Sequence, residues 1–132
     1  MKIEQLVMHP VQLEKVEVVK ISAEKYSESV DRNINIGANI EAKCLTENTG
    51  VAKVELEVGN EDFKIEITTV GHFSYENDFE NNEVIEKFLE TQGIKIIWSY
   101  IRENLYTISS KMVDRPIMLP TIDVMKTLEK TK

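Results

Sequence analysis

Apolar and polar residues alternate strictly between residues 33 and 44. The apolar set is Ile34, Ile36, Ala38, Ile40, Ala42 and Cys44, and the set between them is Asn33, Asn35, Gly37, Asn39, Glu41 and Lys43. Successive side chains of a β-strand point to opposite faces of the sheet, so a period of two predicts a strand with one buried and one solvated face.

Two more alternating segments follow, at residues 53–58 and 63–68. Each comes after a turn signal, Asn48-Thr49-Gly50 for the first and Gly59-Asn60-Glu61-Asp62 for the second. Short turns between consecutive strands favour an antiparallel meander.

A weaker strand is expected earlier, at residues 16–21. Its alternation slips at Val18-Val19, which predicts either a β-bulge or a strand that is apolar on both faces. Residues 1–10 have no assignable pattern, and Pro10 is expected to end whatever they form.

The spacing becomes helical after an acidic loop at residues 76–82, where Asn82 can cap a short helix. Gly93 is expected to break the pattern, and Thr121 to cap a final short helix. Between them one stripe recurs at intervals of three and four: Ile94, Ile97, Trp98, Ile101, Leu105, Ile108 and Met112. Strands followed by helices predict a single α+β domain over residues 1–132, with a four-stranded antiparallel sheet (a meander) and a long helix and short helices packed on one face.

Length and charge narrow the class of protein. The chain has 132 residues and a net charge of −7. The sequence contains no cluster of Lys and Arg, so we expect no nucleic-acid partner. No apolar run approaches the roughly 18–20 residues of a membrane span, and the N-terminus lacks the apolar segment of a signal peptide. We therefore expect a soluble protein that stays in the cytoplasm and does not insert into a membrane.

The residues that could perform chemistry are few. Cys44 is the only cysteine, and it lies on an apolar strand face, so no intrachain disulfide can form and an inert core thiol is expected. His9 and His72 are isolated from each other in the sequence. We find no phosphate-binding glycine loop and no metal-ligand motif. The sequence therefore predicts no enzyme, no catalytic or metal site and no cofactor.

Acidic and aromatic residues are the remaining candidates for a site. Carboxylates follow one hairpin (Glu55, Glu57, Glu61, Asp62 and Glu66) and the loop with the short helix (Asp78, Glu80, Glu83, Glu86 and Glu90). They are either a solvated surface or a dock for a basic partner. The aromatic residues Phe73, Tyr75, Phe79 and Trp98 are either core or the lining of a groove between the sheet end and the helices, a groove that would suit extended polypeptides.

Three segments in register resemble the SecB protein-export chaperone family. The segment 70–73, Val-Gly-His-Phe, resembles the Gly-x-Phe end of the SecB sheet. Residues 97–103, Ile-Trp-Ser-Tyr-Ile-Arg-Glu, resemble the Phe-Pro-Tyr-Ala-Arg-Glu start of its long helix. Residues 116–123, Pro-Ile-Met-Leu-Pro-Thr-Ile-Asp, resemble its Pro-Leu-Leu-Leu-Ala-Pro-Val-Asn run into the last helix. The order and spacing agree over about residues 16–129.

The chain departs from the family pattern at three places. Ser99 replaces a proline, residues 113–115 replace a glycine-rich bend, and the chain ends on Lys130-Thr131-Lys132 instead of an acidic tail. These differences indicate a divergent, SecB-like member.

The resemblance implies a homotetramer, a dimer of dimers, that holds unfolded or precursor polypeptides in apolar grooves without ATP. It also implies docking to the SecA translocation motor through acidic sheet residues, for which Glu55, Glu57 and Glu66 are the candidates. Ile96, Tyr100 and Tyr106 lie off the main helical stripe and would be partly exposed in a lone copy, which also favours an oligomer.

Two alternatives stay open. One is a SecB-like chaperone dedicated to the antitoxin of a toxin–antitoxin system. The other is a small-ligand-binding or enzymatic α+β domain with a cystatin-like curl.

Overall fold

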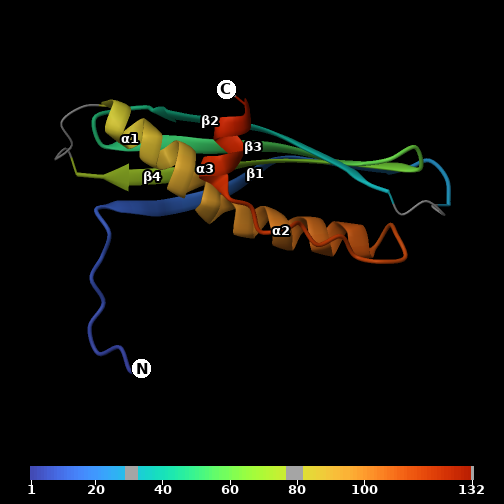
Figure 1. Cartoon of the computed structure of the whole chain (residues 1–132), viewed down its shortest axis with the longest axis horizontal. Helices are drawn as coiled ribbons and strands as arrows, with labels where there is room; N and C mark the ends of the chain where they lie inside the picture. The colour runs from blue at the N-terminus through green and yellow to red at the C-terminus, as the bar shows by residue number, and fades with distance from the viewer. Residues whose placement is uncertain (29–32, 77–81, 132) are drawn as a thin grey trace.

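The computed structural model describes residues 1–28, 33–76 and 82–131. A twisted sheet forms one layer and helices cover part of one of its faces (Figure 1). The elements are β1 (Val11–Lys25), β2 (Asn35–Cys44), β3 (Thr49–Gly59), β4 (Phe63–Tyr75), α1 (Asn82–Phe88), the π-helix η1 (Leu89–Gly93), α2 (Ile94–Ser110) and α3 (Val124–Thr131). The predicted α+β class with a four-stranded antiparallel sheet is confirmed.

The strands lie in the order β1-β4-β3-β2. The predicted meander holds for β2, β3 and β4, which are joined by the two predicted hairpins. It does not extend to β1, which pairs antiparallel with β4 instead of with β2. The result is a Greek-key order. The physical reason is the connection, because Lys25 and Asn35 are too far apart in sequence for the tight turn that joins neighbouring hairpin strands.

β1 is longer than predicted and is irregular. Its register with β4 shifts between Leu13 and Lys15 and again between Val18 and Lys20. The second shift is the bulge that the slip at Val18-Val19 indicates. Each bulge inserts one residue and the alternation resumes beyond it, so the residues of β1 on the helix side of the sheet are apolar from Val11 to Ala23.

Gly93 does not break the helix, contrary to the prediction. It has helical dihedrals (φ −62°, ψ −45°), and α1, η1 and α2 follow one another without a gap. A Cβ at Gly93 would meet Phe73 and Ala52 at 3.4 and 3.5 Å, so the helix backbone lies directly on the sheet there. Packing of this kind outweighs the cost of about 1 kcal/mol that glycine brings to a helix interior.

Hydrogen bonds hold the segment after α2 against that helix. The Trp98 indole Nε1 donates to the Pro120 carbonyl at 3.0 Å, and the Ile117 amide donates to Ser109 Oγ at 2.7 Å. We call residues 111–123 the strap. Asp123 caps α3, because its Oδ1 accepts the Lys126 amide at 3.0 Å, so the predicted cap at Thr121 is wrong by two residues.

The core lies under the middle of the sheet. Every second side chain of β4 from Phe63 to Phe73, apart from Thr69 and Gly71, is a buried apolar residue that contributes to this core, as do the facing residues of β3 from Ala52 to Val58. From the helices, Ile97, Ile101 and Leu105 complete it. The helices cover the outer strands β1 and β2 less completely than β3 and β4. The candidate site lies on these less covered strands.

Candidate functional site

The apolar face of β2 is covered at one end only. Cys44 and Ala42 are half-buried beneath α1 and η1, where the Cys44 amide faces Glu86 Oε1 at 3.5 Å. Ile36 and Ala38, on the same face, are exposed, although their partners on β3 are buried: Ile36 pairs with Val58. The apolar row of the core therefore continues onto an uncovered edge of the sheet.

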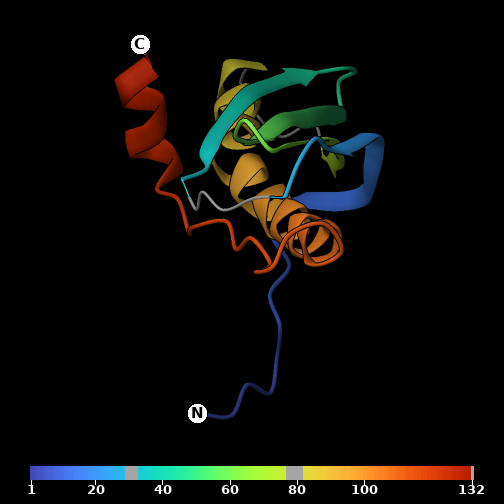
Figure 2. The ribbon, with the colours of Figure 1, turned by 90° about the vertical axis from the view of Figure 1, so that its right-hand side faces the viewer.

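The strap lies on the β2 side of α2 and contains an exposed large apolar side chain. Figures 1 and 2 show the strap and α3 on the β2 side of α2, with β1 on the opposite side. Met118 is exposed, between the buried Ile117 and Leu119. We call the exposed set Ile34, Ile36, Ala38 and Met118 the β2-side surface.

A second apolar surface lies at the opposite edge. Val18 and Ile21 of β1 face the helix layer, opposite Thr69 and Ile67 of β4, and both are exposed. From α2, Ile96, Tyr100 and Tyr106 are exposed as well, as the sequence predicts for a lone copy.

Tyr100 lies on the side of α2 that faces the β1 edge of the sheet. Ile97 and Leu13 both approach Gly71, since a Cβ there would meet Ile97 Cγ2 at 2.6 Å and Leu13 Cδ1 at 3.5 Å. Tyr100 follows Ile97 by three residues and so lies on the same side of the helix. We call Val18, Ile21 and Tyr100 the β1-side surface.

The predicted aromatic groove is not an exposed groove in this chain. Phe73, Tyr75 and Trp98 are only 2%, 7% and 7% exposed, so the prediction that they offer a surface is wrong. The Tyr75 hydroxyl donates to the Thr49 carbonyl at 2.9 Å, and burial raises the pKa of this phenol. The fourth candidate, Phe79, lies outside the described residues. The missed signal is the alternation of β4, which continues to Tyr75 and predicts burial of both Phe73 and Tyr75.

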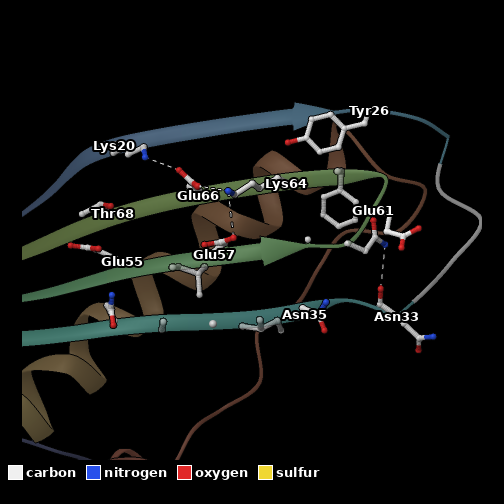
Figure 3. A pocket seen from close by; sticks show the side chains of 18 residues that line it. Lys20, Tyr26, Asn33, Asn35, Glu55, Glu57, Glu61, Lys64, Glu66 and Thr68 are labelled. Carbon is white, nitrogen blue, oxygen red and sulfur yellow. Dashed lines mark hydrogen bonds and ion pairs between the residues drawn. The ribbon is translucent and has the colours of Figure 1, made fainter. Parts of the chain in front are cut away.

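The three acidic candidates lie together on the other face of the sheet. Glu55, Glu57 and Glu66 line an open concavity of about 950 Å³, together with Lys20 and Lys64 (Figure 3). Sheet twist and the hairpin turn between β3 and β4 shape this hollow.

Each of these carboxylates has a lysine partner. Glu66 binds Lys20 at 2.6 Å and Lys64 at 3.0 Å, and Lys64 also lies 3.5 Å from Glu57. Lys53 lies 2.8 Å from Glu55. Hydrogen bonds from Lys20 and Lys64 lower the pKa of Glu66, and the bond from Lys53 lowers the pKa of Glu55. The concavity thus presents paired charges, and a basic partner would have to displace the lysines.

The two histidines are far from each other and serve different contacts. The His9 ring stacks on Phe88 at 4.9 Å between centroids, and its Nδ1 accepts the Val11 amide at 3.0 Å. His72 Nε2 lies 3.6 Å from Glu17 Oε1. Within residues 1–28, 33–76 and 82–131, no group of three or more His, Cys, Asp or Glu side chains is placed to hold a metal ion. The helices in these ranges are too short or too polar to cross a bilayer.

Comparison of the sequence with family models and with curated proteins finds no match. Comparison of the fold does. A Mycobacterium tuberculosis SecB-like chaperone, Rv1957, in complex with a ChAD peptide from the Rv1956 HigA1 antitoxin, superposes with a TM-score of 0.74 at 13% identity, covering 86% of this chain and 91% of the other. A Streptococcus agalactiae protein of unknown function superposes with a TM-score of 0.58 at 14% identity, covering 83% and 96%. The fold predicted from the three sequence segments is therefore the observed one.

Proposed function

We propose that this SecB-like fold is that of a divergent SecB-like chaperone, which binds unfolded polypeptides and holds them without nucleotide. The observation that carries the proposal is the β2-side surface, where the apolar face of the sheet extends beyond its helix cover. Unfolded chains expose apolar segments of no fixed sequence, and contiguous exposed apolar patches on soluble proteins commonly mark interaction sites.

The edge position of β2 explains how such a surface accepts many sequences. β2 pairs with β3 on one side only among the described strands, so its outer backbone groups can bond to an extended client. Alternate client side chains would then pack on Ile36 and Ala38. Main-chain hydrogen bonds supply affinity without a sequence requirement, and the apolar contacts supply the preference for unfolded segments.

The direct test is protection of a chemically denatured client from aggregation, followed by light scattering in buffer without nucleotide. The chain should suppress scattering in proportion to its molar ratio to client, and added ATP should change nothing. An equally acidic protein without an exposed apolar strip is the control for a charge effect. Scattering that is unchanged at a molar excess of the chain would refute the proposal.

A chaperone dedicated to one antitoxin is the second candidate. It is favoured by the solved SecB-like chaperone of the same fold, whose complex contains an antitoxin peptide. Proteins that co-purify with the chain from its native cell separate the two candidates. One dominant small partner supports the dedicated role, and a mixture of precursors supports general export.

An export role requires a docking site for the translocation motor SecA, and we place it on the concavity with Glu55, Glu57 and Glu66. Changing all three to Gln removes the carboxylates and leaves their lysine partners unpaired, so SecA should bind less tightly while client binding persists. Measuring both affinities on the same variant is the test. If the variant binds SecA as tightly as the unchanged chain does, the concavity is not the docking site and this proposal is wrong.

We further propose that the β1-side surface is buried in a cytoplasmic homotetramer. Val18, Ile21 and Tyr100 are apolar and exposed in a lone copy, and burying them would stabilise an assembly. Light scattering should give the mass of four chains, and Tyr100→Ser should shift it toward smaller species.

A further inference from the structure

Residues 1–8 form an apolar arm that the folded domain does not bury. Figures 1 and 2 show the arm leading away from the sheet and the helices. Its five apolar side chains, Met1, Ile3, Leu6, Val7 and Met8, are each at least 68% exposed. Its two charged side chains, Lys2 and Glu4, have opposite sign, and Lys2 Nζ lies 3.8 Å from Glu4 Oε1. The arm thus has the chemistry of an unfolded client segment: extended, apolar and close to neutral.

The base of the arm is fixed. The His9 ring stacks on Phe88, and its Nδ1 accepts the Val11 amide. Its carbonyl accepts a hydrogen bond from Gln12 Nε2 at 2.7 Å. The two hydrogen bonds lie at the start of β1, the strand at the edge opposite β2, and the ring stacking joins His9 to α1.

The arm is too short to seat on the β2-side surface of its own chain. Cys44 is level with Leu13 across the sheet, and Ile36 precedes Cys44 by eight residues, which is about 26 Å along the strand. Three strand spacings add about 14 Å across the sheet, so the direct separation is about 30 Å. Ile3, the outermost residue of the proposed contact, is eight residues from Val11, and an extended chain of that length spans about 29 Å at most. Val11 is two residues farther along the sheet from Ile36 than Leu13 is, so even Ile3 does not reach Ile36 of its own chain.

We propose that residues 1–8 of one copy dock on the β2-side surface of a second copy. The inference rests on the proposed function, because the arm occupies the surface that clients use. Ile3, Leu6 and Val7 pack against Ile36 and Met118 of the neighbouring chain, and the extended backbone of the arm pairs with the open edge of β2. A docked arm covers apolar surface when no client is present and competes with client for it.

The probe for this contact is a fluorescent peptide with the sequence of residues 1–10. The receiving protein is the full chain with Ile3→Ser, Leu6→Ser and Val7→Ser, so that its own arm does not compete. The peptide should bind this variant, a denatured client should displace it, and Ile36→Ser with Met118→Ser should abolish its binding. A peptide with the same three serine substitutions is the negative control. Leu45→Ser, which changes an exposed leucine at the other end of β2, is the control for the surface.

Client affinity in the intact chain gives a second readout. The arm variant should bind a denatured client severalfold more tightly than the intact chain while the copies are assembled. The difference should vanish on dilution below the concentration at which light scattering shows single chains, because the competing arm belongs to another copy. A difference that persists in the dissociated single chain would mean that the arm acts on its own chain, and would overturn the proposal. Absence of peptide binding would also overturn it.

The two proposals can fail separately. If client binds equally to the intact chain and the arm variant, and the peptide does not bind, the chaperone proposal stands and the arm proposal is wrong. If neither protein binds client, the chaperone proposal is wrong, and peptide binding that is sensitive to Ile36→Ser with Met118→Ser still decides whether the arm links copies.

Discussion

Removing apolar area from the β2-side surface should weaken client binding without unfolding the chain. The variant is Ile36→Ser combined with Met118→Ser. Ile36 is 46% exposed and Met118 is 60% exposed, so about half of each side chain is already buried in the free protein. Client binding can bury only the remaining half.

The expected effect follows from that remaining area. Full burial of an Ile or Met side chain is worth about 1.5–3 kcal/mol. Half of this value for each side chain gives an upper limit of about 1.5–3 kcal/mol for the pair, because an extended client does not cover every atom. At 1.4 kcal/mol per factor of ten, client affinity should fall by up to about ten- to a hundredfold.

The assay is a titration of a labelled, denatured client by fluorescence anisotropy, with thermal unfolding of each variant alongside. Leu45→Ser is the matched control, since Leu45 is as exposed as Ile36 but lies in the turn after β2. Unchanged affinity in a folded double variant would refute the assignment of the client surface. An equal loss in Leu45→Ser would show that the effect is nonspecific.

Three further outcomes are expected. Ser109→Ala leaves the buried Ile117 amide without its acceptor, so the free energy of unfolding should fall by about 1–3 kcal/mol in denaturant titration. The strap should also become more sensitive to protease. Protease resistance equal to that of the unchanged chain would contradict the role of Ser109 in holding the strap. The pKa of Glu66 is lowered from its ordinary 4.5, chiefly by its hydrogen bond from Lys20, so its contribution to stability is present above that value and is lost as pH falls through the lower, folded-state pKa. Glu66→Gln should therefore be less stable than the unchanged chain at neutral pH, and the two should converge as the pH falls below that folded-state pKa. A difference in stability that persists in stronger acid would exclude the ion pair as its cause. Cys44→Ala should cost about 1–2 kcal/mol and preserve client binding, because the thiol is half-buried beside the core; loss of binding in a folded Cys44→Ala variant would give the thiol a functional role.

Local patterns of apolar and polar residues predicted much of the fold. The alternation from residue 33 to 44 predicted β2 almost to its ends, because the period of two is a property of the strand backbone itself. The slip at Val18-Val19 located the bulge for the same reason. The long helix followed from its apolar stripe, and the three segments in register led to the SecB-like fold that the solved structures share.

Only the tertiary structure decided what those elements expose. The sequence predicts equal burial for Ile34, Ile36 and Ala38 and for Ile40 and Ala42. Alternation shows that these residues share one face of the strand, but it does not show whether a helix covers that face. For Phe73 and Trp98 the sequence left core and groove lining both open, and packing places them in the core. Lys20, one partner of Glu66, comes from β1, so sequence order hid this pair, which strand register created. The other partners, Lys53 of Glu55 and Lys64 of Glu66, are two residues away on the same strand face. The pairing of β1 with β4 could not be predicted from the sequence either, because pairing between strands distant in sequence depends on how the whole domain packs.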